Sequence, residues 1–139
     1  MTFSRDGLDA LKKSMSLNGM EKYALSRGRG RTKVSLQAQS FGSDLVLLIY
    51  NENAHIGAVA VGEYDFEHER ASVSVITRLG HKDDAVAQQA AYLVSRSLKK
   101  PVCVIAGIHL DDITRDEIER FVENATLAVE SFIKSIKKD

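Results

Sequence analysis

The first half of the chain alternates apolar and polar residues with the period of two that is typical of β-strands. Residues 32–41 predict a half-buried strand. Residues 45–50 are continuously apolar, which predicts a central strand covered on both faces. Residues 55–61 and 72–77 predict two further strands, joined by an acidic connection over 62–70. The short turns at 41–44 and 51–53 reverse the chain between the earlier segments.

The second half changes to the spacing of apolar residues that is typical of amphipathic helices. A helix is predicted from about residue 83 to residue 98, where two lysines and a proline end it. Residues 102–106 predict a short, fully apolar fifth strand. A long helix is predicted over residues 114–137, opened by a Thr-x-x-Glu capping box and carrying a long apolar stripe.

The N-terminal part has a weaker pattern. Residues 6–17 predict a short helix, and residues 26–31 form a glycine-rich basic stretch. We therefore expect an N-terminal helical or flexible segment over 1–26 and a single α+β domain over 27–139. Strands cluster early and helices late, which predicts a mainly antiparallel five-stranded sheet in the order β-β-β-β-α-β-α, with the helices packed on one face.

Composition narrows the class of protein. The chain has 139 residues, 44% of them hydrophobic, and a single cysteine, so it can bury a core but cannot form an internal disulfide. No apolar stretch approaches the roughly 20 residues of a membrane span, and no signal peptide is recognisable. We expect a cytoplasmic protein without a membrane partner. The 19 basic and 19 acidic residues balance, which argues against a nucleic-acid binder.

The balanced charge conceals an asymmetry along the chain. Residues 1–43 hold 8 basic against 3 acidic residues, and residues 44–139 hold 11 basic against 16 acidic residues. The basic surplus is concentrated at residues 27–33, and part of the acidic surplus precedes the two predicted helices. We therefore expect the basic segment to fold back over an acidic end of the sheet. An arginine that pairs there with an aspartate is not free to bind phosphate.

The expected topology brings four connections to one end of the sheet, namely residues 27–31, 51–55, 80–84 and 107–112. Helix N-termini are natural anion sites, arginine suits phosphate, and glycines let a ligand approach the backbone. The candidate ligand-binding residues at this end are Arg29, Arg31, His55, Gly57, His81, Asp83, Asp84, Gly107, His109, Asp111 and Asp112.

These residues leave several functions open. They suit a phosphorylated, flat ligand that is bound without being transformed, as in a nucleotide-binding protein. A metal-dependent hydrolase or lyase that uses His55, His81 and His109 is the alternative, although no pair of histidines has the local spacing of a metal motif. A third possibility is an assembly protein that docks a partner on its C-terminal apolar stripe.

Three segments together resemble a known family. They are His-Ile-Gly-Ala-Val-Ala at 55–60, Gly-His-Lys-Asp-Asp at 80–84 and Ala-Gly-Ile-His-Leu-Asp-Asp at 106–112, with Gly-Ser-Asp-Leu at 42–45. They are similar to the prenylated-flavin chaperones, the LpdD-like small D-subunits of gallate and 4-hydroxybenzoate decarboxylases. The resemblance spans roughly residues 27–125.

The resemblance implies a non-catalytic role. Such proteins hold prenylated FMN and pass it to a UbiD-type decarboxylase, and a flavin prenyltransferase is a further candidate partner. It also implies an α+β fold, a small homo-oligomer such as a trimer, and a ligand site lined or supported by the histidines and aspartates of the three segments. The turn at residues 51–54 departs from the family pattern, because Glu52 stands where a glycine-rich turn is expected.

Overall fold

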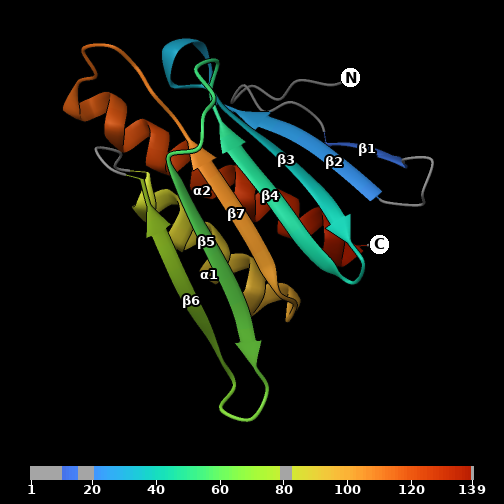
Figure 1. Cartoon of the computed structure of the whole chain (residues 1–139). Coiled ribbons are helices and arrows are strands. Elements are labelled where there is room, and N and C mark those ends of the chain that lie inside the picture. Colours follow the sequence, from blue (N-terminus) through green and yellow to red (C-terminus); the bar gives the residue numbers. More distant parts are fainter. Residues whose placement is uncertain (1–10, 16–20, 79–82, 139) are drawn as a thin grey trace.

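The computed structural model describes residues 11–15, 21–78 and 83–138, and in them it shows a seven-stranded sheet with two helices on one face (Figure 1). The strands are β1 (Lys12–Met15), β2 (Glu21–Arg27), β3 (Val34–Phe41), β4 (Asp44–Tyr50), β5 (Ala58–Asp65), β6 (Arg70–Thr77) and β7 (Val102–Gly107). The helices are α1 (Asp84–Leu98), α2 (Arg115–Lys138) and the short 3-10 turn η1 (Gly30–Thr32).

The sheet has the strand order β1-β2-β3-β4-β7-β5-β6. All neighbouring pairs are antiparallel except β4 and β7, which run parallel. The α+β class is therefore confirmed, and the order of elements from β3 onward is the predicted one. The prediction of five strands was imprecise, because the described sheet is mixed and has seven.

The two additional strands lie in the N-terminal segment. The short helix predicted over 6–17 is wrong for residues 12–15, which form β1, and the rest of that prediction except Leu11 lies outside the described residues. β2 pairs along its length with β3, so residues 21–26 belong to the sheet. Tyr23 and Leu25 of β2 are buried, and the Tyr23 ring meets Phe132 of α2 edge-on at 5.5 Å between centroids. Phe132 is distant in sequence from Tyr23, and the alternation of Tyr23 and Leu25 is too short to reveal the strand by itself.

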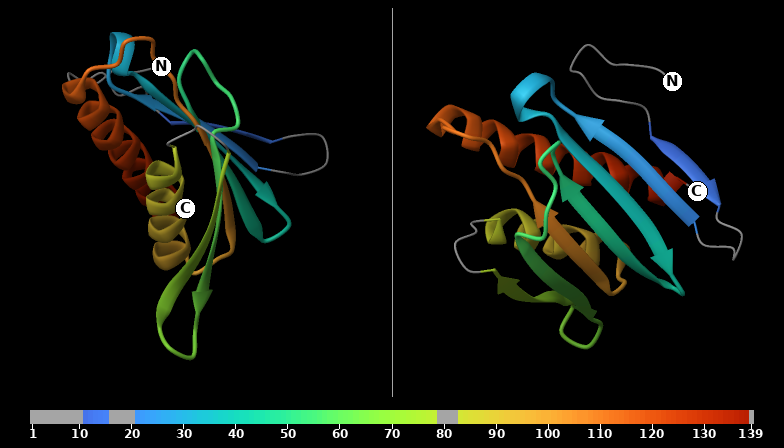
Figure 2. Two further views of the ribbon diagram at one scale, coloured as in Figure 1. Left: turned by 60° about the vertical axis from the view of Figure 1, so that its left-hand side comes forward. Right: turned by 45° about the horizontal axis from the view of Figure 1, so that its top comes forward.

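Both helices pack on the same face of the sheet (Figure 2). The contact between α1 and β5 is built from small residues. A Cβ atom at Gly62 would lie 2.5 Å from the carbonyl oxygen of Ala91 and 2.8 Å from the hydroxyl of Ser95. Glycine at this position therefore lets the helix approach the strand closely, as close-packed interiors require.

No helix of the described chain covers the opposite face, which we call the open face; Figure 1 looks onto it. The prediction that residues 45–50 are covered on both faces is wrong for this chain by itself. Leu45, Leu47 and Ile49 are buried under the helices, whereas Val46 is only half-buried and Leu48 is exposed on the open face. The apolar pattern of this strand is therefore unexplained by the single chain.

Candidate functional site

Segments from three parts of the chain meet at the end of the sheet where β4 and β7 finish and β5 begins. The side-chain amides of Asn51 and Asn53 donate to the carbonyl of His109 at 2.8 and 3.0 Å. The His109 amide donates back to the Asn51 side chain at 3.3 Å. The connections after β4 and after β7 are thus fastened to each other, as the topology predicted. His81, in the fourth predicted connection, lies outside the described residues.

The carboxylate of Asp83, just before α1, is buried against this junction. One of its oxygens accepts the Ile108 amide at 3.3 Å, and the other lies 3.5 Å from Nε2 of His55. A Cβ atom at Gly57 would stand 1.8 Å from that second oxygen. Asp83 therefore occupies the space over Gly57 and joins α1 to both loops.

Gly107 likewise allows a close approach, here between the end of β7 and the loop that precedes β5. A Cβ atom at this position would lie 1.6 Å from the carbonyl oxygen of His55. The sequence predicts that Gly57 and Gly107 let a ligand approach the backbone closely. The structure instead fills the space above each of them with protein, namely the Asp83 side chain and the His55 backbone.

The two described histidines of the site are held differently. Nδ1 of His55 lies 2.9 Å from the carbonyl oxygen of Asn53, which requires this nitrogen to donate. When the ring is protonated, Nε2 also donates, toward Asp83. His109 is more exposed, and its Nε2 lies 3.1 Å from the Asp111 carboxylate.

Arg31 joins the basic segment to the start of α2. Its guanidinium donates to the Glu117 carboxylate at 2.8 Å and to the backbone carbonyl of Asp111 at 2.9 Å. The predicted capping box is present, because Glu117 also accepts the Thr114 amide at 3.0 Å and the Thr114 hydroxyl accepts the Glu117 amide at 3.2 Å. The basic segment does fold over this end, but the partner of Arg31 is Glu117 and not an aspartate carboxylate.

These contacts shift the ionisation of both groups. The hydrogen bond from Arg31, followed by that from the Thr114 amide, lowers the pKa of Glu117 to about 2. The hydrogen bond to Glu117 raises the pKa of Arg31. Both groups of the pair are therefore ionised near neutral pH.

A pocket of about 390 Å³ opens beside this junction, between the loop after β7 and the first turns of α1 and α2. That volume lies in the range of small-molecule sites. Its walls are mainly apolar, with polar groups at three positions. The lining residues are His55, Asp83, Ala85, Val86, Ile108, His109, Leu110, Ile113, Ile118, Phe121 and Val122.

The pocket includes only part of the predicted set. Among the described candidates, His55, Asp83 and His109 line it. The others lie outside the lining. Asp84 accepts the amide of Ala85 at the start of α1, Asp112 has a left-handed backbone with φ of 52°, and Arg29 is exposed before η1.

Sequence reasoning missed the apolar walls of the pocket. It assigned Ile118 and Val122 to the packing stripe of the last helix, yet they are 49% and 38% exposed. They flank Phe121, which is buried in the core, and so lie at the edges of the packed face of α2. An apolar stripe that is wider than the buried face of its helix was the available signal.

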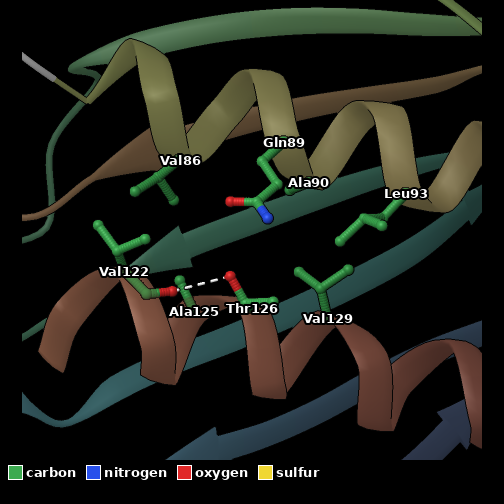
Figure 3. A pocket seen from close by; sticks show the side chains of 8 residues that line it. All are labelled: Val86, Gln89, Ala90, Leu93, Val122, Ala125, Thr126 and Val129. Carbon is green, nitrogen blue, oxygen red and sulfur yellow. Dashed lines mark hydrogen bonds between the residues drawn. The ribbon is translucent and has the colours of Figure 1, made fainter. Parts of the chain in front are cut away.

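A second hollow lies between α1 and α2 (Figure 3). It holds only about 10 Å³, because side chains from the two helices point toward one another and fill it. Thr126 turns its hydroxyl back to the Val122 carbonyl at 2.9 Å. This space admits about one water molecule and is a helix-packing seam.

No cluster of three or more His, Cys, Asp or Glu in the described part of the chain is arranged to hold a metal ion. The metal-dependent enzyme that the sequence left open therefore has no support from residues 11–15, 21–78 and 83–138. Among the same residues, no helix is long and apolar enough to cross a membrane.

The fold is similar to that of a chain in a solved chaperone complex for yeast 20S proteasome assembly. The TM-score is 0.54 at 16% identity, with 84% of this chain and 96% of that chain covered. At this identity the likeness concerns the fold alone. No curated protein matches the chain.

The family model of the prenylated flavin chaperone LpdD-like domain matches residues 28–137, which is most of the chain. This range contains the three motif segments, the fastened loops and every residue that lines the pocket. The chain therefore belongs to the family of prenylated flavin chaperones with an LpdD-like domain.

Proposed function

We propose that the chain binds prenylated FMN in the pocket beside His55 and His109, and delivers it to a UbiD-type decarboxylase without transforming it. The observation that carries the proposal is the pocket itself. It has about 390 Å³, apolar walls and two imidazoles, and it is lined by residues of the matched family domain.

The lining suits a flat ring system with polar edges. Ile108, Ile113 and Phe121 supply apolar surface against which a ring can lie, as small-molecule sites commonly do. His55 and His109 stand on the same lining and supply ring nitrogens that can hydrogen-bond the carbonyl groups of a flavin. The chain has no tryptophan, so the stacking surface is mainly aliphatic.

The start of α2 is poorly suited to the phosphate group. Its capping positions are already satisfied within the chain, and Asp116 and Glu117 make its first turn acidic. Arg31 is engaged by Glu117 and the Asp111 carbonyl. We therefore assign recognition mainly to the ring. A phosphate left near the surface would remain accessible to the enzyme that accepts the cofactor.

Coexpression with a flavin prenyltransferase tests the proposal. The purified protein should carry prenylated FMN, identified by absorbance and mass spectrometry, and should activate a cofactor-free UbiD-type decarboxylase. Ile118→Glu places a charge in the pocket at a position 49% exposed, so it should abolish loading while the fold survives.

Phe66→Glu is the matched control. Phe66 is 68% exposed and lies in the turn between β5 and β6, at the other end of the sheet. This variant should load normally. A wild-type protein that stays free of flavin contradicts the proposal, and so does equal loading of the two variants. If the protein loads prenylated FMN but does not activate the decarboxylase, only the proposed delivery step is contradicted and the binding proposal stands.

A further inference from the structure

The open face of the sheet carries an apolar surface that the single chain leaves uncovered. The central parts of three strands, β4, β7 and β5, are apolar on both sides, although only the helix side is buried. Figure 1 looks onto this face. Its apolar residues are Val46, Leu48, Tyr50, Val59, Val61, Cys103 and Ile105.

The margins of the same face are polar. β3 contributes Gln37 and Gln39 on one side, and β6 contributes Ser72 and Ser74 on the other, although Ile76 of β6, 72% exposed, carries the apolar surface out to one corner of this margin. An apolar centre with a polar rim, depleted of charge at its core, is the usual anatomy of a protein interface. Single exposed apolar residues are ordinary, but a contiguous group on adjacent strands indicates a binding surface.

We propose that the open face joins two copies of this chain, sheet against sheet, about a two-fold axis that runs along the central strands. An apolar sheet face can cover a second copy of itself, since twisted sheets pack face to face about 10 Å apart with their inner side chains interdigitated. The uncharged centre offers no recognition for a charged partner.

The size of the face fits a stable dimer. The width of the face is set by the strands from β2 to β6 in the sheet order, which lie about 4.8 Å apart. Its length is that of a 7-residue strand such as β4, at about 3.3 Å per residue, so the projected area is about 650 Å². The solvent-accessible area is larger than this projected area because the side chains project from the plane of the sheet. Stable interfaces bury about 800 Å² per partner, which this face can supply.

Charge at the margins selects the direction of the axis. Lys12 of β1 and Lys22 of β2 lie on the open face at one margin, and Glu63 of β5 lies toward the other. At that second margin Asp65 and Arg70 are paired across β5 and β6, so their opposite charges offset each other and Glu63 supplies the net charge. An axis along the strands brings Lys22 of one copy toward the margin that carries Glu63 of the other. An axis across the strands would instead superpose like charges, which is unfavourable.

The first test measures mass by light scattering and sedimentation at about 100 µM chain. The wild-type protein should be a dimer. Val61→Arg should weaken the dimer at least about thirtyfold, because it buries an unpaired charge in the interface. Val61 is already 49% exposed in the single chain, so the variant should fold, which circular dichroism checks. Phe66→Arg, outside the face, should leave the dimer intact.

A second test uses the charged margins and the single cysteine. Lys22→Glu and Glu63→Lys should each weaken the dimer, and the double variant should restore it. Cys103 should react more slowly with a thiol reagent in the wild-type dimer than in Val61→Arg. A wild-type protein that is monomeric overturns the proposal, and would be expected if a different protein covers the open face. A trimer, a dimer insensitive to Val61→Arg, or a double variant without rescue overturns it as well.

Discussion

The Asp83 carboxylate fills the position that a side chain at residue 57 would take, since a Cβ atom at Gly57 would lie 1.8 Å from Asp83 Oδ2. The two residues are held together by the crossing of the β4–β5 loop with the N-terminus of α1. Asp83 in turn accepts the Ile108 amide and faces His55, so this one contact positions both sides of the pocket.

Gly57→Ala should destabilise the protein by about 1–3 kcal/mol, because the added methyl group displaces a carboxylate that is buried among hydrogen-bond donors. Urea unfolding measures the loss. In an Asp83→Ala background the same change should cost clearly less, since the obstructing side chain is gone. Equal costs in the two backgrounds would show that Asp83 does not set the requirement for glycine.

Asn51→Ala should cost about 1–3 kcal/mol of unfolding free energy, because it leaves the His109 amide without its partner and removes one donor to the His109 carbonyl. Asn51 is buried, whereas Asn53 is exposed and makes only one of these contacts to His109. Asn53→Ala is therefore the matched control and should cost less than about 1 kcal/mol. Similar losses for both variants would contradict this assignment.

The Arg31–Glu117 contact should stabilise the protein in a pH-dependent way. The pKa of Glu117 is about 2 in the folded chain against an ordinary value of 4.5. A lowered folded pKa means that the contribution is complete above pH 4.5 and is lost as the pH falls toward 2. The unfolding free energies of wild type and Glu117→Gln should therefore differ by a constant amount above pH 5 and converge below pH 4.5.

Glu123→Gln provides the control for this titration, because it removes an acidic residue of the same helix that makes no contact with Arg31 among the hydrogen bonds and ion pairs described above. Glu123→Gln should therefore not reproduce the loss of unfolding free energy that Glu117→Gln shows above pH 5. If the difference in unfolding free energy between wild type and Glu117→Gln does not change between pH 6 and pH 2.5, the proposed role of this pair is refuted.

Removal of the phosphate group should affect cofactor binding only weakly. A direct bond from Arg31 to the phosphate would be worth about 1.5–3 kcal/mol, or at least about tenfold in affinity. Because Arg31 is held by Glu117, we expect the dephosphorylated cofactor to bind within about threefold of the intact one. Fluorescence titration measures both affinities. If the dephosphorylated cofactor binds a hundredfold more weakly than the intact one, the phosphate must contact a basic group of this chain.

The elements from β3 to α2 could be predicted because each follows from local chemistry. Alternating residues or short apolar runs predicted the strands, the lysines and Pro101 ended the first helix, and the Thr114–Glu117 capping box opened the second. The meeting of the loops at residues 51–55 and 107–112 also followed from the sequence, since short connections allow only one path for each strand.

The tertiary structure alone decided the features that depend on contacts distant in sequence. β1 is four mostly polar residues and exists because it pairs with β2, so it leaves no apolar period. β2 has only two alternating large apolar residues, Tyr23 and Leu25, and the contact of Tyr23 with Phe132 of α2 comes from far along the chain. The partner of Arg31 and the tight fit at Gly57 depend on the exact approach of separate segments, which composition cannot specify.

The sequence by itself therefore determined the order of elements from β3 to α2, the family, and the end of the sheet at which the loops of the candidate site meet. The three-dimensional packing decided which of the candidate residues line a pocket and which support it, because that depends on side chains brought together from far apart in the chain. It also showed that the apolar pattern of β4 is covered on one face only, which a single chain's sequence cannot reveal.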